Sequence, residues 1–120
     1  MLHDVVKWRK VLDPRVLALP EGAVMRAVVG QYAVCFARTG AGLFAVEDRC
    51  PHQGKSFAGG HCENGYLICP WHRMHFDPAT GRNRGGSTAN VPTYPLEERA
   101  DGLYIGMPGT SLYLFGIRWW

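Results

Sequence analysis

The stretch from residue 50 to 75 constrains this chain most, because it holds two short pairs of metal-binding side chains. Cys50 and His52 form the first pair in Cys-Pro-His, and after sixteen further residues Cys69 and His72 form the second in Cys-Pro-Trp-His. Each pair supplies one thiolate and one imidazole, which suits a two-iron cluster that two loops grip from opposite sides. The spacing therefore predicts a metal centre held by Cys50, His52, Cys69 and His72.

Two other interpretations fit these four residues less well. A structural zinc site usually places at least two residues between the members of each ligand pair, so the Cys-x-His half fits zinc poorly. Taken alone, each cysteine would most often be a buried thiol and each histidine a surface residue. Four ligands in register with two Cys-Pro dipeptides favour a [2Fe-2S] cluster over both.

The length and charge of the chain exclude several classes of protein. At 120 residues the chain forms one domain. The remaining histidines, His3, His61 and His75, include no pair placed with a carboxylate for a second, mononuclear iron, so the chain cannot be a whole oxygenase. His61 and His75 are expected to be structural. A net charge of +3 with scattered basic residues gives no sign of nucleic-acid binding.

The sequence has no run of eighteen apolar residues, and its first ten residues mix acids and bases. We therefore expect no membrane anchor and a cytoplasmic location. Cys35 lies in the alternating segment YAVCFA and is expected to be a small buried residue of a strand. Cys62 lies in GGHCENG, and the sequence predicts no role for it.

The pattern of apolar residues predicts an all-β fold, because many short strands alternate with Gly and Pro and no segment is an amphipathic helix. Gly30-Gln31 should form a type II′ hairpin turn. The glycines between the two ligand pairs either aim backbone amides at the cluster or serve only as turn residues. They are Gly54, Gly59, Gly60 and Gly65. The expected strands are 5–11, 23–29, 32–37, 43–46, 66–68 and 103–106, and the segment 15–19 is too short for a helix.

The sequences CPHQG, CPWH, FDPATG and VPTYPLEERADGLYIG resemble those of a Rieske ferredoxin that supplies electrons to bacterial oxygenases. The resemblance is densest from Leu43 to Gly106. It implies that both cysteines bind the inner iron of the [2Fe-2S] cluster and both histidines the outer one. It also implies the Rieske fold in a single domain, 1–120: an antiparallel β-barrel or sandwich with an inserted cluster-binding subdomain at about 48–82.

The resemblance implies a soluble one-electron carrier between a flavin-dependent reductase and a terminal oxygenase. The carrier is not an enzyme itself, because the outer iron has no open coordination site. Partners are expected to dock over the two ligand histidines, among Pro51, Gln53, Lys55, Trp71 and Arg73. Two alternatives remain open: the small iron-sulfur subunit of a larger enzyme such as a nitrite reductase, and a zinc-stabilised interaction module.

The residues that follow His72 bear on the reduction potential. High-potential respiratory relatives carry a Ser and a Tyr hydroxyl two and four residues after this ligand, where the present chain has Met74 and Phe76. We expect a potential within roughly 100 mV of −150 mV, falling as the pH rises. Arg73 stands where oxygenase ferredoxins usually have Gly; its guanidinium lies either beside His72 or in solvent.

The respiratory relatives also join their two cluster loops by a disulfide, at positions that correspond to Lys55 and Trp71 here. The present chain lacks this disulfide, so packing and hydrogen bonds must hold its loops. Trp71 is expected to pack over the cluster rather than to anchor a partner. The apolar end of the chain, residues 112–120, either completes the sheet or forms a patch for a partner or a second copy.

Overall fold

The computed structural model describes the backbone of residues 2–51, 54–71, 73–86, 89–114 and 117–119, and the side chains from residue 6 to 107 within those ranges. Its described residues form strands and turns without a helix, which confirms the all-β prediction. Accordingly, no described segment is a helix that could cross a membrane. The strands are β1 Leu2–Lys10, β2 Val24–Val29, β3 Tyr32–Thr39, β4 Gly42–Glu47, β5 His61–Glu63, β6 Tyr66–Ile68, β7 His75–Phe76, β8 Thr93–Tyr94, β9 Leu96–Arg99, β10 Gly102–Leu114 and β11 Ile117–Trp119.

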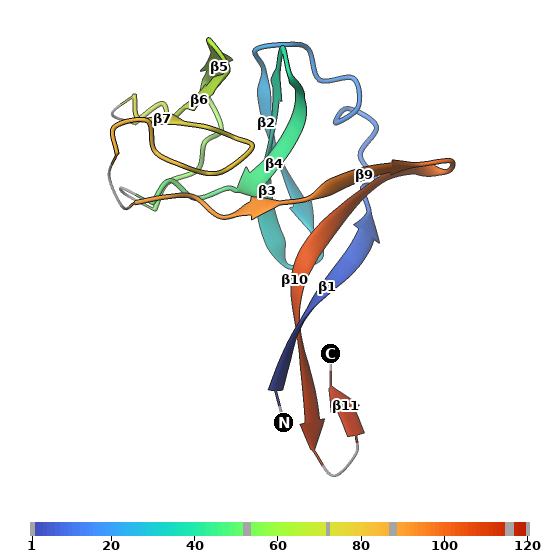
Figure 1. Ribbon diagram of the computed structural model, residues 1–120. Helices are drawn as coiled ribbons and strands as arrows, with labels where there is room; N and C mark the ends of the chain where they lie inside the picture. The colour runs from blue at the N-terminus through green and yellow to red at the C-terminus, as the bar shows by residue number, and fades with distance from the viewer. Residues whose placement is uncertain (1, 52–53, 72, 87–88, 115–116, 120) are drawn as a thin grey trace.

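The strands form three antiparallel sheets. The central sheet has the order β2-β3-β4-β8, and the outer sheet has the order β1-β10-β11, with β9 also paired to β10. The third sheet, β5-β6-β7, lies within residues 61–76 and is called the cluster sheet here. Figure 1 shows the cluster sheet on one side of the central sheet and the long β1–β10 pair on the other. The base is a sandwich; the described strands do not close into a barrel.

Strand β3 explains why the central sheet is covered on both faces. Successive side chains of a strand point to opposite faces, and β3 is apolar on both. Val34 and Phe36 pack against the outer sheet, in one core with Ile105 and Met107. Cys35 and Ala37 face the other way, into a second core that the cluster sheet and both ligand cysteines share.

Two hairpins show how local sequence sets the register. The β2–β3 hairpin pairs Val29 with Tyr32 across Gly30-Gln31, and Gly30 has a φ of 62°, as the predicted type II′ turn requires. The β5–β6 hairpin turns at Asn64 and Gly65, whose φ values of 53° and 82° are typical of a type I′ turn. Strand β6 is one of the expected strands, whereas β5 is not.

The outer sheet differs most from the expected strands. The first strand spans Leu2–Lys10 rather than 5–11, and the strand expected at 103–106 extends over Gly102–Leu114. β1 pairs with β10 from Leu2↔Leu112 to Lys10↔Tyr104, so the two strands continue beyond the body as a ribbon (Figure 1). The segment 15–19 forms turns, as expected.

Candidate metal centre

Two loops of the same design carry the predicted ligands. The Cys50 N–H donates to the Lys55 carbonyl at 2.7 Å, and the Cys69 N–H donates to the Met74 carbonyl at 2.9 Å. Each loop therefore starts at a cysteine and closes five residues later, with its ligand histidine in between. His52 and His72 lie outside the described residues, so their predicted roles stay predictions.

The two cysteines meet in the core between the central and cluster sheets. Cys50 and Cys69 are 2% and 1% exposed and pack in one core with Phe57 and Phe76. The pKa of the Cys69 thiol is raised to about 11: burial is the main cause, the Trp71 backbone N–H lowers the pKa by donating to the sulfur, and the adjacent Cys50 thiol raises it. Two neighbouring thiols in an apolar site lose their protons readily only to a bound cation, so the donor pair fits the inner iron of a cluster.

Among the described residues, the Trp71 amide is directed at the Cys69 sulfur, a contact that residue patterns do not indicate. The Gly54 N–H donates to the Cys50 carbonyl at 2.6 Å, and the Gly60 N–H to the Phe57 carbonyl at 2.9 Å. These two amides are occupied within their own turns. For Gly54 and Gly60 the structure therefore favours the turn role over the amide-donor role.

A buried carboxylate anchors the first loop. Asp48, whose side chain is fully buried, accepts hydrogen bonds from the Ser56 hydroxyl at 2.5 Å and the Phe57 N–H at 2.8 Å. It also forms an ion pair with Arg26 on β2, at 3.1 Å. This network ties both ends of the loop to the central sheet. Sequence reasoning missed it, because only the contact with β2 distinguishes Asp48 from an ordinary loop acid.

Lys55 and Trp71 connect the two loops at the positions where the respiratory relatives place their disulfide. The Lys55 ammonium lies 3.9 Å from the centre of a Trp71 ring, a cation–π contact. Trp71 remains 46% exposed. A non-covalent contact therefore joins the loops, in accord with the expectation that packing holds them together.

Arg73 occupies an unusual backbone conformation beside the second ligand pair. Its φ is 53°, in the left-handed region that favours glycine, which accounts for the glycine usual at this position in oxygenase ferredoxins. Its guanidinium lies 3.8 Å from the Glu63 carboxylate, and both side chains are largely exposed. Solvent screens this pair. Of the two alternatives, the exposed Arg73 side chain favours the guanidinium in solvent.

Met74 and Phe76 lie close to the ligand cysteines. Phe76 is fully buried and meets Phe57 edge to face at 5.7 Å, and Met74 packs against the same core. Neither side chain can donate a hydrogen bond. The surroundings of the cysteines that the structure describes are accordingly apolar, which supports the prediction of a low potential.

The histidines that were expected to be structural both have local partners. His75 Nδ1 lies 2.8 Å from the Arg73 carbonyl oxygen, and His61 Nε2 lies 3.1 Å from the Glu63 carboxylate. Neither belongs to a cluster of three or more metal-binding side chains within the described residues. Both positions agree with structural roles.

The two other cysteines lie beneath the site. Cys35 is a buried residue of β3, as predicted, and burial raises its pKa far above the usual value. Cys62 packs against the same core from β5, where burial raises its pKa to about 11. Both are therefore protonated thiols at neutral pH, poorly suited to nucleophilic chemistry.

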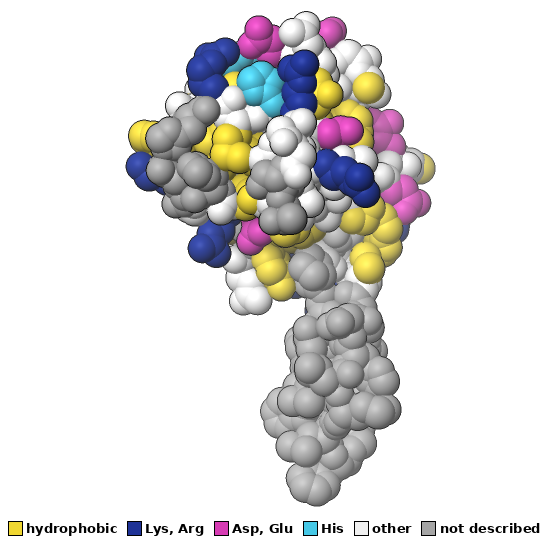
Figure 2. All heavy atoms as spheres, turned by 60° about the vertical axis from the view of Figure 1, so that its left-hand side comes forward, with side chains coloured by type: hydrophobic (Ala, Val, Ile, Leu, Met, Phe, Trp, Pro, Cys, Tyr) yellow, Lys and Arg dark blue, Asp and Glu magenta, His cyan; other side chains and the backbone are white. Residues whose placement is uncertain are grey.

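The surface around the loops is mixed. Pro51, Lys55, Trp71 and Arg73 are exposed, as a docking surface requires, and Gln53 lies outside the described residues. Figure 2 shows this side of the molecule, with Lys, Arg and acidic side chains scattered among hydrophobic ones.

Known proteins with similar sequences and folds agree with this geometry. The chain is 29% identical over 90 residues to the ferredoxin component of the naphthalene 1,2-dioxygenase system of Pseudomonas aeruginosa, covering 74% of this chain and 86% of that protein. It is 31% identical over 75 residues to the nitrite reductase of Emericella nidulans, covering 54% of this chain and 7% of that protein.

A similar solved structure is that of a protein described as an NADH-dependent nitrite reductase small subunit from Mycobacterium tuberculosis. The two share a TM-score of 0.71 at 18% identity, over 86% of this chain and 96% of that one, a likeness that concerns the fold. The Rieske [2Fe-2S] domain family itself matches residues 7–95, a range that includes both ligand pairs. The chain therefore belongs to the Rieske [2Fe-2S] domain family.

Proposed function

We propose that this protein is a one-electron carrier whose [2Fe-2S] cluster is bound by Cys50, His52, Cys69 and His72. The observation that carries the proposal is the pair of matching loops, which bring two buried thiols together. The sequence of each loop includes one histidine. When bound, the cluster accepts and releases single electrons. The chain contributes the two thiolates, the Trp71 amide on one of them and the apolar core around both.

The partners that fit this function are a flavin-dependent reductase and a terminal oxygenase. The ferredoxin component of a naphthalene dioxygenase system is a relative at 29% identity, and the exposed Lys55, Trp71 and Arg73 give the loops an aromatic and basic surface. Such a surface favours brief contact with an acidic-rimmed partner. We place the protein in the cytoplasm, because Lys55 and Trp71 stand where the respiratory relatives carry the disulfide between their loops, and loops held without a disulfide suit a reducing compartment.

Ligand substitutions test the assignment. In holoprotein expressed with iron and sulfide, Cys50→Ser, Cys69→Ser, His52→Ala and His72→Ala should each lose most of the iron and inorganic sulfide. Cys35→Ser, Cys62→Ser, His61→Ala and His75→Ala are matched controls that should keep two irons and two sulfides and take up one electron in a dithionite titration. Zinc in place of iron, or loss of the cluster in a control variant, would contradict the ligand set.

A second candidate is the small iron-sulfur subunit of a larger redox enzyme. The likeness to part of a nitrite reductase favours it. A subunit should co-purify with its large partner in constant ratio from native extract, whereas a carrier should elute alone and exchange electrons with added reductase. The family match argues against the zinc-stabilised interaction module.

A further inference from the structure

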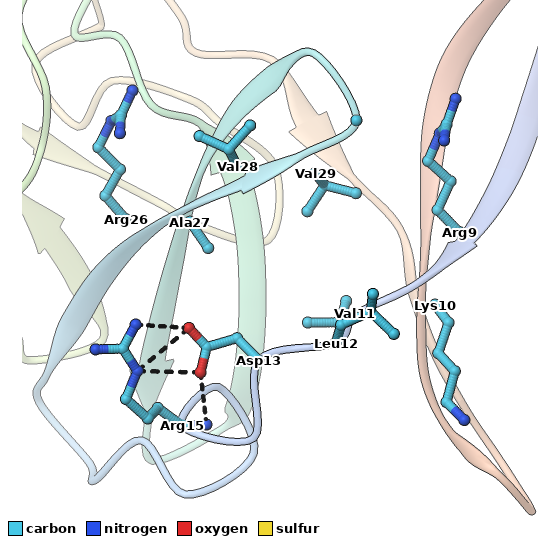
Figure 3. Close-up of a pocket in the computed structure, with 11 residues that line it drawn as sticks. Arg9, Lys10, Val11, Leu12, Asp13, Arg15, Arg26, Ala27, Val28 and Val29 are labelled. Atoms are coloured by element: carbon cyan, nitrogen blue, oxygen red, sulfur yellow. Dashed lines mark hydrogen bonds and ion pairs between the residues drawn. The ribbon is translucent and has the colours of Figure 1, made fainter.

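A groove of about 740 Å³ lies on the base of the molecule, between the end of β1 and strand β2 (Figure 3). One wall consists of residues 9–13 with Arg15, and the other of residues 26–30. None of the residues in the two cluster loops lines it. The groove is therefore separate from the expected site of electron exit.

The β2 wall is a free sheet edge. In the described sheets, β2 pairs only with β3. Val29 and Tyr32 flank the two-residue loop of this hairpin, so these two residues form both backbone hydrogen bonds with each other. Hydrogen-bonded pairs recur at every second residue, so the backbone groups of Ala27 also point towards β3. At the other end of the hairpin, the Arg38 N–H donates to the Ala23 carbonyl, as this alternation requires.

The N–H and C=O groups of Arg26 and Val28 consequently point away from β3. Within the described residues no backbone hydrogen bond reaches them from another segment. They form two donor–acceptor pairs about 7 Å apart along the edge, the spacing that an added extended strand matches.

Five of the side chains that line the groove are apolar, and two of these five are largely exposed. Val28 is 60% exposed and Leu12 84%. Figure 3 shows Val29 on one side of the space, with Val11 and Leu12 on the other. Val28 points to the cluster-sheet side of β2, whereas Val29 and Ala27 point to the same side as Val11. An extended segment whose backbone pairs with β2 would therefore place alternate side chains over Val28 and the remaining ones on the opposite face, towards Val29 and Val11.

The charge of the groove indicates what the opposite face of the segment must carry. Four basic residues and one acidic residue line it. Lys10, Arg15 and Arg26 have carboxylate partners, in Asp101, Asp13 and Asp48 respectively. Arg9, which lies beside Gly30 at the end of β2, has no carboxylate at ion-pair distance in the described part of the chain.

We propose that the free edge of β2 binds an extended segment of a partner protein as an added β-strand, with apolar side chains over Val28 on one face and a carboxylate on Arg9 on the other. Acidic and apolar residues alternate in this segment. Pairing with the β2 edge of a second copy fits less well, because it would bring two basic grooves together. Binding here would tether a partner while the cluster loops stay open to it.

A defined peptide tests the proposal on the holoprotein. The probe is a fluorescein-labelled, acetylated and amidated hexapeptide of alternating Glu and Val, measured by fluorescence anisotropy against its Lys-Val counterpart. We expect the Glu-Val peptide to bind at least tenfold more tightly, and increasingly weakly as salt is added. A version N-methylated at every second residue, made in both registers, should lose binding in one register only, because only alternate amides of an added strand face β2.

Variants locate the binding site. Val28→Pro removes one outward N–H, leaves the hairpin bonds intact and should abolish binding, whereas Val28→Thr should retain it. Arg9→Glu should weaken binding at least tenfold; Arg82→Glu makes the same charge change outside the groove and should alter it less than twofold. Circular dichroism and cluster absorbance verify that each variant folds. If Val28→Pro does not fold, Arg9→Glu and the N-methylated peptides still test whether the peptide binds at the β2 edge.

Two results would overturn the proposal. The first is equal binding of the Glu-Val and Lys-Val peptides, or no binding of either. The second is a protein dimer in sedimentation that Val28→Pro dissociates, because that result would assign the β2 edge to a second copy.

Discussion

At the scale of single residues, Arg73 carries a local strain that the sequence alone does not show. A residue with a side chain in the left-handed region costs about 1–2 kcal/mol, of which glycine avoids most. The nearby Glu63 does little to offset this strain, because both side chains of the pair are exposed. Arg73 is thus held in place by the closure of the second loop between Cys69 and Met74.

We predict that Arg73→Gly stabilises the holoprotein. Glycine removes the strain but loses more backbone entropy on folding. The net effect should raise the free energy of unfolding by about 0.5–1 kcal/mol. The midpoint of thermal unfolding should then rise by about 2–4 °C for a chain of this size. Arg73→Ala removes the same side chain but keeps the strain, and it should not raise the midpoint. Equal midpoints for the two variants would show that the conformation of Arg73 is not strained.

The contact between Lys55 and Trp71 leads to a second prediction. An exposed cation–π contact contributes about 0.5–1 kcal/mol, so its coupling energy should change the rate of cluster loss roughly two- to fivefold. The measurement is a double-mutant cycle of Lys55→Ala and Trp71→Ala, followed by the decay of cluster absorbance with a chelator present. Lys55→Arg preserves the cation and should restore the wild-type rate. Strictly additive effects of the two alanine substitutions would show that the contact does not hold the loops.

At the scale of elements, Asp48 joins the first loop to strand β2. Asp48→Ala leaves the Phe57 N–H without its acceptor and Arg26 without its partner, and should destabilise the protein by about 2–4 kcal/mol. Arg26→Met should have a smaller effect, because the Arg26 side chain is about half exposed. Chemical denaturation compares the variants, and amide exchange at Phe57 should accelerate most in Asp48→Ala. Unchanged exchange at Phe57 would rule out the anchoring role.

The elements that the sequence predicts well are those whose signals are local. The β2–β3 hairpin follows from alternating apolar residues and a glycine at the first turn position, and the two cysteines meet as their spacing indicates. Strand β5 was missed, although Asn64-Gly65 is a strong local hairpin signal. Asp48, the Trp71 amide and the full length of β10 depend on contacts between distant segments, so residue patterns could not predict them.

At the scale of the whole molecule, the sandwich separates two surfaces. The cluster sheet carries the loops on one side of the central sheet, whereas the β2 edge and the end of β1 form a groove that none of the loop residues lines. The two surfaces are linked through Arg26, which lines the groove and forms the ion pair with Asp48 that anchors the first loop.

The potential of the cluster reflects this placement of an apolar core behind the ligand cysteines. We predict a value within roughly 100 mV of −150 mV near neutral pH, because Met74 and Phe76 donate no hydrogen bond. The value should fall as the pH rises into the alkaline range, since reduction favours protonated imidazole. Redox titrations of the holoprotein between pH 6 and 10 measure both properties, and a value above about +100 mV or one independent of pH would contradict them.

A substitution at Met74 tests the cause of the low potential. Met74→Ser introduces a hydroxyl where the high-potential respiratory relatives carry one. A hydrogen bond worth about 1 kcal/mol to the reduced cluster corresponds to a rise of about 40 mV for one electron. Met74→Ala truncates the same side chain without adding a donor, so it reports the effect of solvent entry alone. The hydroxyl is responsible only if the potential of the serine variant exceeds that of the alanine variant by about this amount. If the two potentials are equal, solvent access near Cys69 rather than hydrogen bonding sets the value, and the apolar packing of Met74 against this core is the feature that keeps it low.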